Sequence, residues 1–228
     1  MNNIRMNAEM TKAILEGCKT QTRRIIKEKL EKPTDSKFPE NGTYLDSYNN
    51  TKKWYWWTKD GRQSLNKCIK AKYQKDEVIW VREPARVVGD IYYDAVEVEY
   101  VADGKKTDVD VSRLKNSEKG ISNYPEWIYK QRGIPNGCIK EMARIFLKIT
   151  DVRVEKLQDI SDGDIKQEGV LLPDDFKKTM MWSENQQMGS GWIELWDKTA
   201  PKGHMWEDNP YVFVYEFKRV KRYGVNYE

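Results

Sequence analysis

The pattern of apolar and polar residues predicts both helices and strands along the chain. Met6, Met10 and Ile14 recur every four residues, which places them on one face of a helix. Asn7 is a typical N-terminal cap and Gly17 a typical C-terminal stop, so we expect this helix to lie between them. Four further segments alternate in polarity or are apolar on both faces, and we expect strands at 78–81, 91–101, 143–156 and 211–220.

Two helical regions are expected in the C-terminal half. Ser161, followed by acidic residues, predicts a helix start, and Gly169 predicts the end of that helix. Glu168 therefore falls at a helix C-terminus, where the dipole disfavours a carboxylate and tends to raise its pKa. Residues 174–198 carry apolar patches that predict one or two helices, with a break at 189–191.

Two stretches lack a clear period. The section at about 30–75 begins as a polar loop and then carries aromatic residues around a hairpin expected to turn at Asn49-Asn50. The section at about 103–140 is expected to form loops, with a short helix near 126–130. Nothing marks a clean domain boundary, so we expect a single α+β domain over 1–228 that contains both irregular sections.

Composition narrows the possible chemistry. The chain has 228 residues, of which 39% are hydrophobic and 33% charged, and its nine Trp and thirteen Tyr are typical of a folded protein. No run approaches the roughly 18 apolar residues of a membrane span, and no signal-peptide core is present at the N-terminus. We therefore expect a cytoplasmic protein without a membrane partner. The net charge of +4 is compatible with a nucleic acid partner but is weak support for one.

The few histidines and cysteines exclude several mechanisms. One histidine, His204, argues against Ser-His or Cys-His catalysis and against a multi-histidine metal site. The three cysteines, Cys18, Cys68 and Cys138, are far apart and lack zinc-site spacing. Acid–base chemistry would then fall mainly to Lys, Glu, Asp or Tyr, and no metal or cofactor is expected.

The segment Lys19–Arg24 concentrates the polar chemistry of the N-terminal region. In a strand, Lys19 shares a face with Gln21 and Arg23, and Thr22 lies on the opposite face. In a bend, Lys19 and Thr22 would meet, and a neutral lysine amine would activate the threonine hydroxyl. The simplest interpretation of this segment is a solvated basic strand at a sheet edge. The residues alone leave these alternatives open.

The same segment resembles a known family. The run Ile14-Leu15-Glu16-Gly17-Cys18-Lys19-Thr20-Gln21-Thr22-Arg23-Arg24 is similar to the N-terminal signature of ASCH domains, a branch of the PUA-like β-barrels. The phage-encoded group of this superfamily looks closest. Further similar stretches follow in the family's order: Asp76–Glu83, Arg144–Glu155, Leu157–Val170 and Asn209–Phe217. The resemblance implies a mixed PUA-like barrel with flanking helices, in a bacterial or phage-encoded protein.

The resemblance also implies a reaction. One bacterial branch consists of small N4-acetylcytidine amidohydrolases, and their catalytic lysine, threonine and glutamate fall on Lys19, Thr22 and Glu168. In that chemistry, Thr22 attacks the acetyl carbonyl, Lys19 takes or steers its proton, and Glu168 passes a proton to the leaving amine. The expected substrate is a modified nucleoside or a base in RNA or DNA. The alternative is a non-catalytic RNA- or DNA-binding module.

Six further residues are candidates for substrate or nucleic-acid contact: Thr20, Arg23, Arg24, Arg82, Glu83 and Arg144. For Arg82 and Glu83, a strand-end ion pair is the competing interpretation, and Arg144 either faces a phosphate or pairs with an acid. The aromatic residues at 52–57 suit base stacking beside a phosphate, but they equally suit simple coverage of a barrel.

Overall fold

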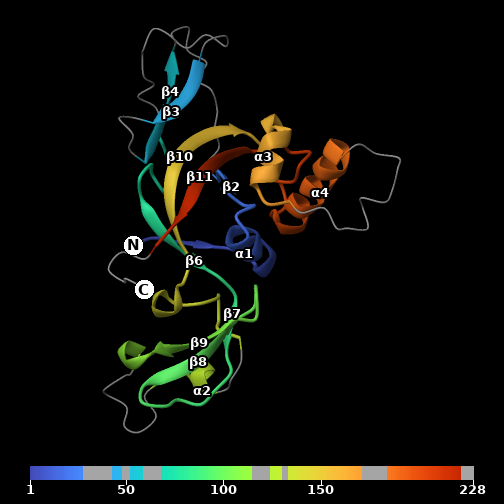
Figure 1. Ribbon diagram of the computed structural model, residues 1–228. Coiled ribbons are helices and arrows are strands. Elements are labelled where there is room, and N and C mark those ends of the chain that lie inside the picture. The colour runs from blue at the N-terminus through green and yellow to red at the C-terminus, as the bar shows by residue number, and fades with distance from the viewer. Residues whose placement is uncertain are drawn as a thin grey trace. The chain divides into compact units, whose positions relative to one another are not determined.

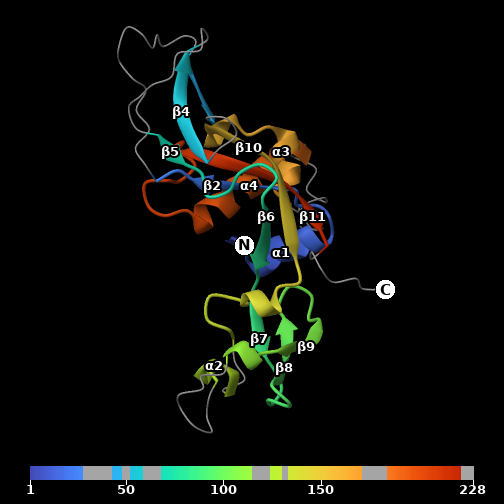
Figure 2. The ribbon, with the colours of Figure 1, turned by 90° about the vertical axis from the view of Figure 1, so that its left-hand side faces the viewer.

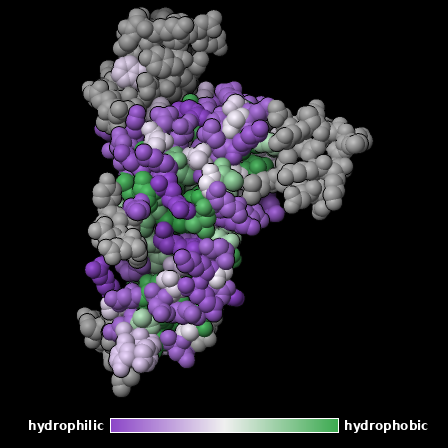
Figure 3. All heavy atoms as spheres, in the orientation of Figure 1, coloured by the Kyte–Doolittle hydropathy of each residue, from purple (hydrophilic) through white to green (hydrophobic). Residues whose placement is uncertain are grey.

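The computed structural model describes residues 1–27, 43–47, 52–58, 68–114, 124–129, 133–170 and 184–221 (Figure 1). It is a mixed α+β protein with several sheets, which confirms the predicted α+β class. None of the sheets formed by the described residues closes on itself. Hydrophilic residues cover much of the described surface on the face in Figure 3, with apolar residues showing between them.

The residues group into two compact units, each assembled from separated segments. The first unit contains Met1–Gly17, Val78–Leu147 and the chain from Arg219, and the second contains Cys18–Glu77 and Lys148–Lys218. Where the sequence predicted one domain, the chain thus passes between units several times. This interleaving explains why no single boundary is visible in the sequence.

The first unit contains a parallel strand pair and a small antiparallel sheet. Strand β1 (Asn3–Arg5) pairs in parallel with β6 (Val78–Arg82), so that Ile4 lies opposite Val81. Strands β7, β8 and β9 form the antiparallel sheet in that order, and Figure 2 shows them side by side. The bounds of the remaining elements are β7 Ala85–Val87, β8 Ala95–Tyr100, β9 Lys106–Asp110, α1 Ala8–Leu15 and α2 Glu126–Tyr129, with 3₁₀ turns at Ser112–Leu114 and Lys140–Met142.

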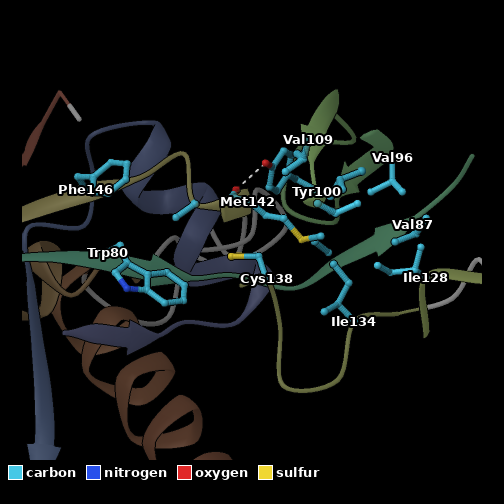
Figure 4. Packing of buried hydrophobic residues seen from close by; sticks show 14 residues of the cluster. Trp80, Val87, Val96, Tyr100, Val109, Ile128, Ile134, Cys138, Met142 and Phe146 are labelled. Atoms are coloured by element: carbon cyan, nitrogen blue, oxygen red, sulfur yellow. Dashed lines mark hydrogen bonds between the residues drawn. The ribbon is translucent and has the colours of Figure 1, made fainter. Parts of the chain in front are cut away.

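The core of this unit lies over the β7-β8-β9 sheet. Alternate residues of β8 point inward, and Val96, Val98 and Tyr100 are all buried. The phenol of Tyr100 donates a hydrogen bond of 2.6 Å to the carbonyl oxygen of Met142, drawn as a dashed line in Figure 4. This bond satisfies a buried hydroxyl and ties the sheet to the turn at 140–142.

The second unit is built on the strand order β10-β11-β2. Strand β2 (Gln21–Ile25) pairs antiparallel with β11, with Arg23 opposite Val214. A second sheet has the order β3-β4-β5. The other elements are β3 Thr43–Ser47, β4 Lys53–Thr58, β5 Ile69–Lys70, β10 Phe146–Lys156, α3 Asp162–Gln167, α4 Glu184–Thr199 and β11 Tyr211–Val220, with a 3₁₀ turn at Leu157–Asp159. Strands β10 and β11 each continue from one unit into the other.

Helix α4 packs on this unit through residues four positions apart. Met188, Trp192 and Trp196 recur every four residues, are buried, and join Val212 and Val214 of β11 in one apolar cluster. The sequence predicted a break at 189–191, which is wrong, because the helix continues through both glycines. The buried tryptophans offset the low helix propensity of glycine, which costs about 1 kcal/mol for each residue.

Other elements both match and depart from the sequence pattern. The short helix predicted near 126–130 is confirmed by α2. The prediction of loops elsewhere in the section at about 103–140 is wrong for residues 106–110, which form strand β9. Only Val109 of β9 is buried, so this strand has too little apolar alternation to be recognised. Strands β3 and β4 pair antiparallel as the predicted hairpin requires. The turn proposed at Asn49-Asn50 lies outside the described residues.

Candidate functional site

The backbone joins the start of β2 to the end of α3. The chain leaves α1 through Gly17, whose φ of 79° is the left-handed stop expected of this glycine. Lys19 then forms an isolated antiparallel bridge with Glu168, and the Thr20 N–H donates to the Gln167 carbonyl at 2.8 Å. Residues 149 positions apart in sequence are thereby placed side by side.

Local helix chemistry places Glu168. The Ser161 hydroxyl accepts a bond from the Asp164 N–H, and the Asp164 carboxylate accepts from the Ser161 N–H, so the predicted capping box is confirmed. At the other end of α3, Glu168 is the C-terminal cap and Gly169 follows with φ 75°. Both ends of this six-residue helix are therefore capped, and Glu168 is fixed directly after its last residue.

Lys19, Arg23 and Glu168 form a buried ion-pair cluster. The Lys19 amine donates to Glu168 Oε2 at 2.6 Å and to the Glu168 carbonyl oxygen at 2.8 Å. Arg23 Nη1 donates to Glu168 Oε1 at 3.0 Å. The exposed fractions are 2% for Lys19, 2% for Arg23 and 4% for Glu168, so this is not a solvated basic strand. Both oxygens of one carboxylate are held by cations.

Arg23 is fixed on its other sides as well. Its Nε donates to Glu155 at 3.0 Å, and its Nη2 lies 3.5 Å from Asp164 Oδ2. The guanidinium carbon lies 5.9 Å from the centre of the Trp192 ring. These contacts leave Nη1 directed at Glu168, so Arg23 orients that carboxylate.

Burial perturbs the pKa of Lys19. Desolvation lowers the pKa of the amine from the usual 10.5, against the opposing effects of Glu168, and the charges of Arg24 and Arg23 lower it further. The pKa of Arg24 is also lowered, first by burial, with Glu168 opposing. Lys19 is thus an amine that gives up its proton more readily than an exposed lysine does.

A second layer of side chains surrounds the cluster, and sequence reasoning did not assign it. Gln21 donates to Asp164 Oδ1 at 2.7 Å, and Arg153 binds Asp164 Oδ1 and Glu155 Oε2, each at 3.0 Å. Strand alternation places Gln21 on the same face as Lys19 and Arg23, and this pattern in the sequence indicated that Gln21 would lie beside the cluster. For Arg153 and Glu155, the sequence showed only two opposite charges two residues apart on a predicted strand, which indicates a shared face but no contact with the cluster.

The other predicted residues of β2 face away from the cluster. Gln21 and Arg23 reach Asp164 and Glu168 from one face of the strand, so Thr22 and Arg24 lie on the other face. Thr22 is 2% exposed. The structure therefore has the strand geometry rather than the bend, and Thr20 shares the Thr22 face.

The remaining candidates lie in the first unit. Arg144 donates to both oxygens of Glu83, at 2.9 and 2.8 Å, and to both oxygens of Asp103. Its guanidinium carbon lies 3.9 Å from the centre of the Tyr100 ring. Arg82 does not join this group, and its buried Nε has no partner among the described residues. The structure thus brings Glu83 and Arg144 together as an ion pair.

Fold and site define a mixed α+β protein with several sheets and a buried Lys–Arg–Glu cluster in its second unit. No family model, no curated protein and no solved structure matches this chain. Within the described ranges, no three His, Cys, Asp or Glu side chains lie together as metal ligands would. Among the same residues, no helix has the length and apolar character needed to cross a membrane.

Proposed function

We propose that the Lys19–Arg23–Glu168 cluster is the centre of a hydrolase site for an acylated nucleobase, in an ASCH domain of the PUA-like type. The expected substrate is N4-acetylcytidine or a similar amide. The observation that carries the proposal is the buried Lys19 amine, which has a lowered pKa and lies 2.6 Å from a carboxylate. Buried groups with pKa values moved toward neutrality are typical of acid–base sites.

The roles follow from the proton path. The neutral amine of Lys19 takes the proton of the nucleophile as the new C–O bond forms on the acetyl carbon. The Lys19–Glu168 hydrogen bond then carries a proton toward the leaving exocyclic amine as the C–N bond breaks. Cytidine leaves, and the acetyl group ends as acetate after water has added. Arg23 serves as a positioning residue, because it holds the second oxygen of Glu168.

The nucleophile is either Thr22 or water, and one variant separates the two. The resemblance implies Thr22, which would form an acetyl ester during the reaction. Thr22 lies on the strand face opposite Lys19, an arrangement that favours water as the nucleophile. If Thr22 is the nucleophile, Thr22→Ala loses turnover. If Lys19 activates water, Thr22→Ala retains it.

The test is release of cytidine from N4-acetylcytidine, followed by chromatography. We expect turnover by the wild-type protein and its loss in Lys19→Gln and Glu168→Gln, with folding of each variant checked by circular dichroism. Lys166→Gln, an exposed lysine of the same unit, is the matched control and retains turnover. Unchanged turnover in both Lys19→Gln and Glu168→Gln would overturn the proposal, and so would absence of turnover by the wild type.

The pH dependence gives a second readout. Because the neutral amine is the base, kcat/KM rises with pH and levels off below the usual lysine pKa of 10.5. Burial lowers the pKa of Lys19 and so places the midpoint below the usual value; Glu168 raises this pKa, and Arg24 and Arg23 lower it further. A pH-independent rate would be inconsistent with Lys19 as the base.

A further inference from the structure

A two-residue turn at Tyr93-Asp94 leads into β8 of the first unit. Tyr92 and Ala95 exchange both backbone hydrogen bonds at 2.9 Å, which closes a hairpin around the turn. Tyr93 has a φ of 46° and Asp94 a φ of 62°, and both central residues of a type I′ turn need such left-handed values. Asn and Gly are the usual residues there, because the Cβ of a larger residue is crowded. Turn formation alone therefore does not explain Tyr93.

Two aromatic rings project into solvent from this turn. Tyr92 is 73% exposed and Tyr93 is 88% exposed, and their ring centres lie 4.4 Å apart at an angle of 72°. The turn is anchored through Asp94, whose carbonyl oxygen accepts from the Val111 N–H at 2.8 Å and whose carboxylate accepts from the Tyr124 hydroxyl. Exposed tyrosines held in one place are typical of surfaces that bind a partner.

The strand register places Tyr92 beside an acidic sheet face. Residues opposite each other on antiparallel strands point to the same face. Ala95 lies opposite Tyr92 on one side and opposite Asp110 on the other, so these three side chains form one row. In the next row, Glu97 lies opposite Asp108, and like charges in this arrangement repel. The alternate residues of β8 that pack in the core point to the other face, so these rows face outward.

This outward face carries more carboxylates than cations. Each of its two cations binds one carboxylate, at 2.7 and 3.3 Å: Arg86 binds Glu99, and Lys106 binds Glu97. Asp108 and Asp110 are exposed on the same face, so four carboxylates stand against two cations. The excess negative charge attracts cations and repels phosphate groups. Aromatic rings beside it favour the same choice, because their faces attract ammonium and guanidinium groups.

We propose that Tyr92, Tyr93, Asp108 and Asp110 form a docking surface for a lysine- or arginine-rich segment of a partner protein. The rings contact the stems and charged heads of the basic side chains, and the carboxylates pair with them. Successive rows lie about 6–7 Å apart, which is the spacing of alternate side chains in an extended peptide. The inference goes beyond the hydrolase proposal and is independent of it, because all four residues belong to the first unit.

Calorimetry with the full chain tests which partner binds. The probes are pentalysine and pentaarginine amides, a pentaglutamate peptide, and a single-stranded RNA oligonucleotide whose bases could stack on the tyrosines. We expect both basic peptides to bind more tightly than the other two probes, and their binding to weaken with added salt. Tighter binding of the RNA than of the basic peptides would overturn the proposal, and so would absence of peptide binding at low salt.

A charge variant assigns the binding to this face. Asp108→Asn combined with Asp110→Asn should weaken pentalysine binding about fivefold or more, because two solvent-exposed ion pairs are lost. Glu9→Gln removes an exposed carboxylate of the same unit and is the matched control, which keeps wild-type affinity. Unchanged affinity in the folded double variant would contradict the assignment.

The tyrosine variant separates binding from folding. Tyr93→Asn should weaken pentalysine binding about threefold, since one cation–π contact is lost. The urea midpoint of this variant should equal or exceed that of the wild type, because Asn accepts the left-handed conformation of residue 93. Val101→Ser removes a 52% exposed apolar side chain directly after β8 and should leave binding unchanged. A lowered midpoint with unchanged binding in Tyr93→Asn would show a purely structural role and overturn the proposal.

Discussion

Each of the two units contains an arginine held between carboxylates, but the two clusters differ in what they can do. In the first unit, Arg144 binds Glu83 and Asp103, so one cation faces two carboxylates. In the second unit, one carboxylate, Glu168, is shared by Arg23 and Lys19. The first arrangement neutralises a cation, and the second concentrates cations around one buried anion.

The difference lies in the presence of lysine. A guanidinium stays charged at all accessible pH values, so Arg144 serves mainly to hold Glu83 and Asp103 in place. A buried amine changes its pKa readily, and the pKa of Lys19 is lowered by desolvation. Of the two clusters, only that of the second unit contains a cation able to exchange a proton, which is why acid–base chemistry is proposed there.

The largest expected effect comes from removing the shared carboxylate. Glu168→Ala leaves the amine of Lys19 and one side of Arg23 buried without their charge partner, which costs about 3–5 kcal/mol of unfolding free energy. Urea denaturation measures this loss. Glu168→Gln also removes the charge but keeps one acceptor oxygen with little change in volume, so the comparison separates the lost charge from the lost side-chain volume. A loss below about 1 kcal/mol would show that these cations find other partners.

Removing the arginine of the first unit should cost less. Arg144→Met leaves Glu83 buried without its cation, but the Arg144 side chain is 18% exposed, so water replaces part of the interaction. We expect a loss of about 2–3 kcal/mol in urea denaturation. Glu83→Gln combined with Arg144→Met should recover much of it, because no buried carboxyl is then unpaired. A larger loss than in Glu168→Ala would reverse the ranking of the clusters.

Sequence reasoning recovered the elements whose signals are local. The cap at Asn7, the capping box at Ser161 and the left-handed stops at Gly17 and Gly169 all follow from residue type at one position. Strand β9 and the continuity of α4 depend on packing instead. The grouping into two units depends on contacts between distant segments, which local patterns do not record.

The candidate site was predictable in part for the same reason. Strand alternation places Lys19 and Arg23 on one face, but nothing local indicates that Glu168 meets them across 149 positions. That pairing was expected only from the family resemblance. Asp164 was expected as a capping residue, and its second role beside Arg23 emerges only from the packing of α3 on β2.

Lowering the pH should test Asp164, a carboxylate beside the cluster of the second unit, and the expected loss of unfolding free energy is smaller than in the variants above. Burial favours a higher pKa for Asp164, but hydrogen bonds from Gln21 and Ser161 and the charge of Arg23 outweigh it and lower the pKa from 3.8 to about 2. A carboxyl with a depressed folded pKa stabilises the protein above its unfolded pKa. We therefore expect about 1–2 kcal/mol to be lost as the pH falls from about 4 to about 2.

The variant Asp164→Asn isolates this contribution. Its unfolding free energy, measured by urea denaturation across the same pH range, should fall less steeply than that of the wild type. Asp208→Asn, whose carboxylate accepts a bond from Met205 N–H, gives the matched removal of one surface carboxylate. Parallel pH profiles for the wild type and Asp164→Asn would contradict the depressed pKa.

The smallest expected effect is at the exposed edge of the first cluster. The Asp103 side chain is 33% exposed and binds an arginine already paired with Glu83, so Asp103→Asn should cost only about 0.5–1 kcal/mol. Urea denaturation at low and high salt measures it, and the cost should shrink with salt because the pair is reached by solvent. Glu168→Gln, by contrast, alters a pair that solvent hardly reaches, so its effect should change little with salt. A strong salt dependence of both variants would remove the distinction between a screened ion pair in the first unit and a desolvated one in the second.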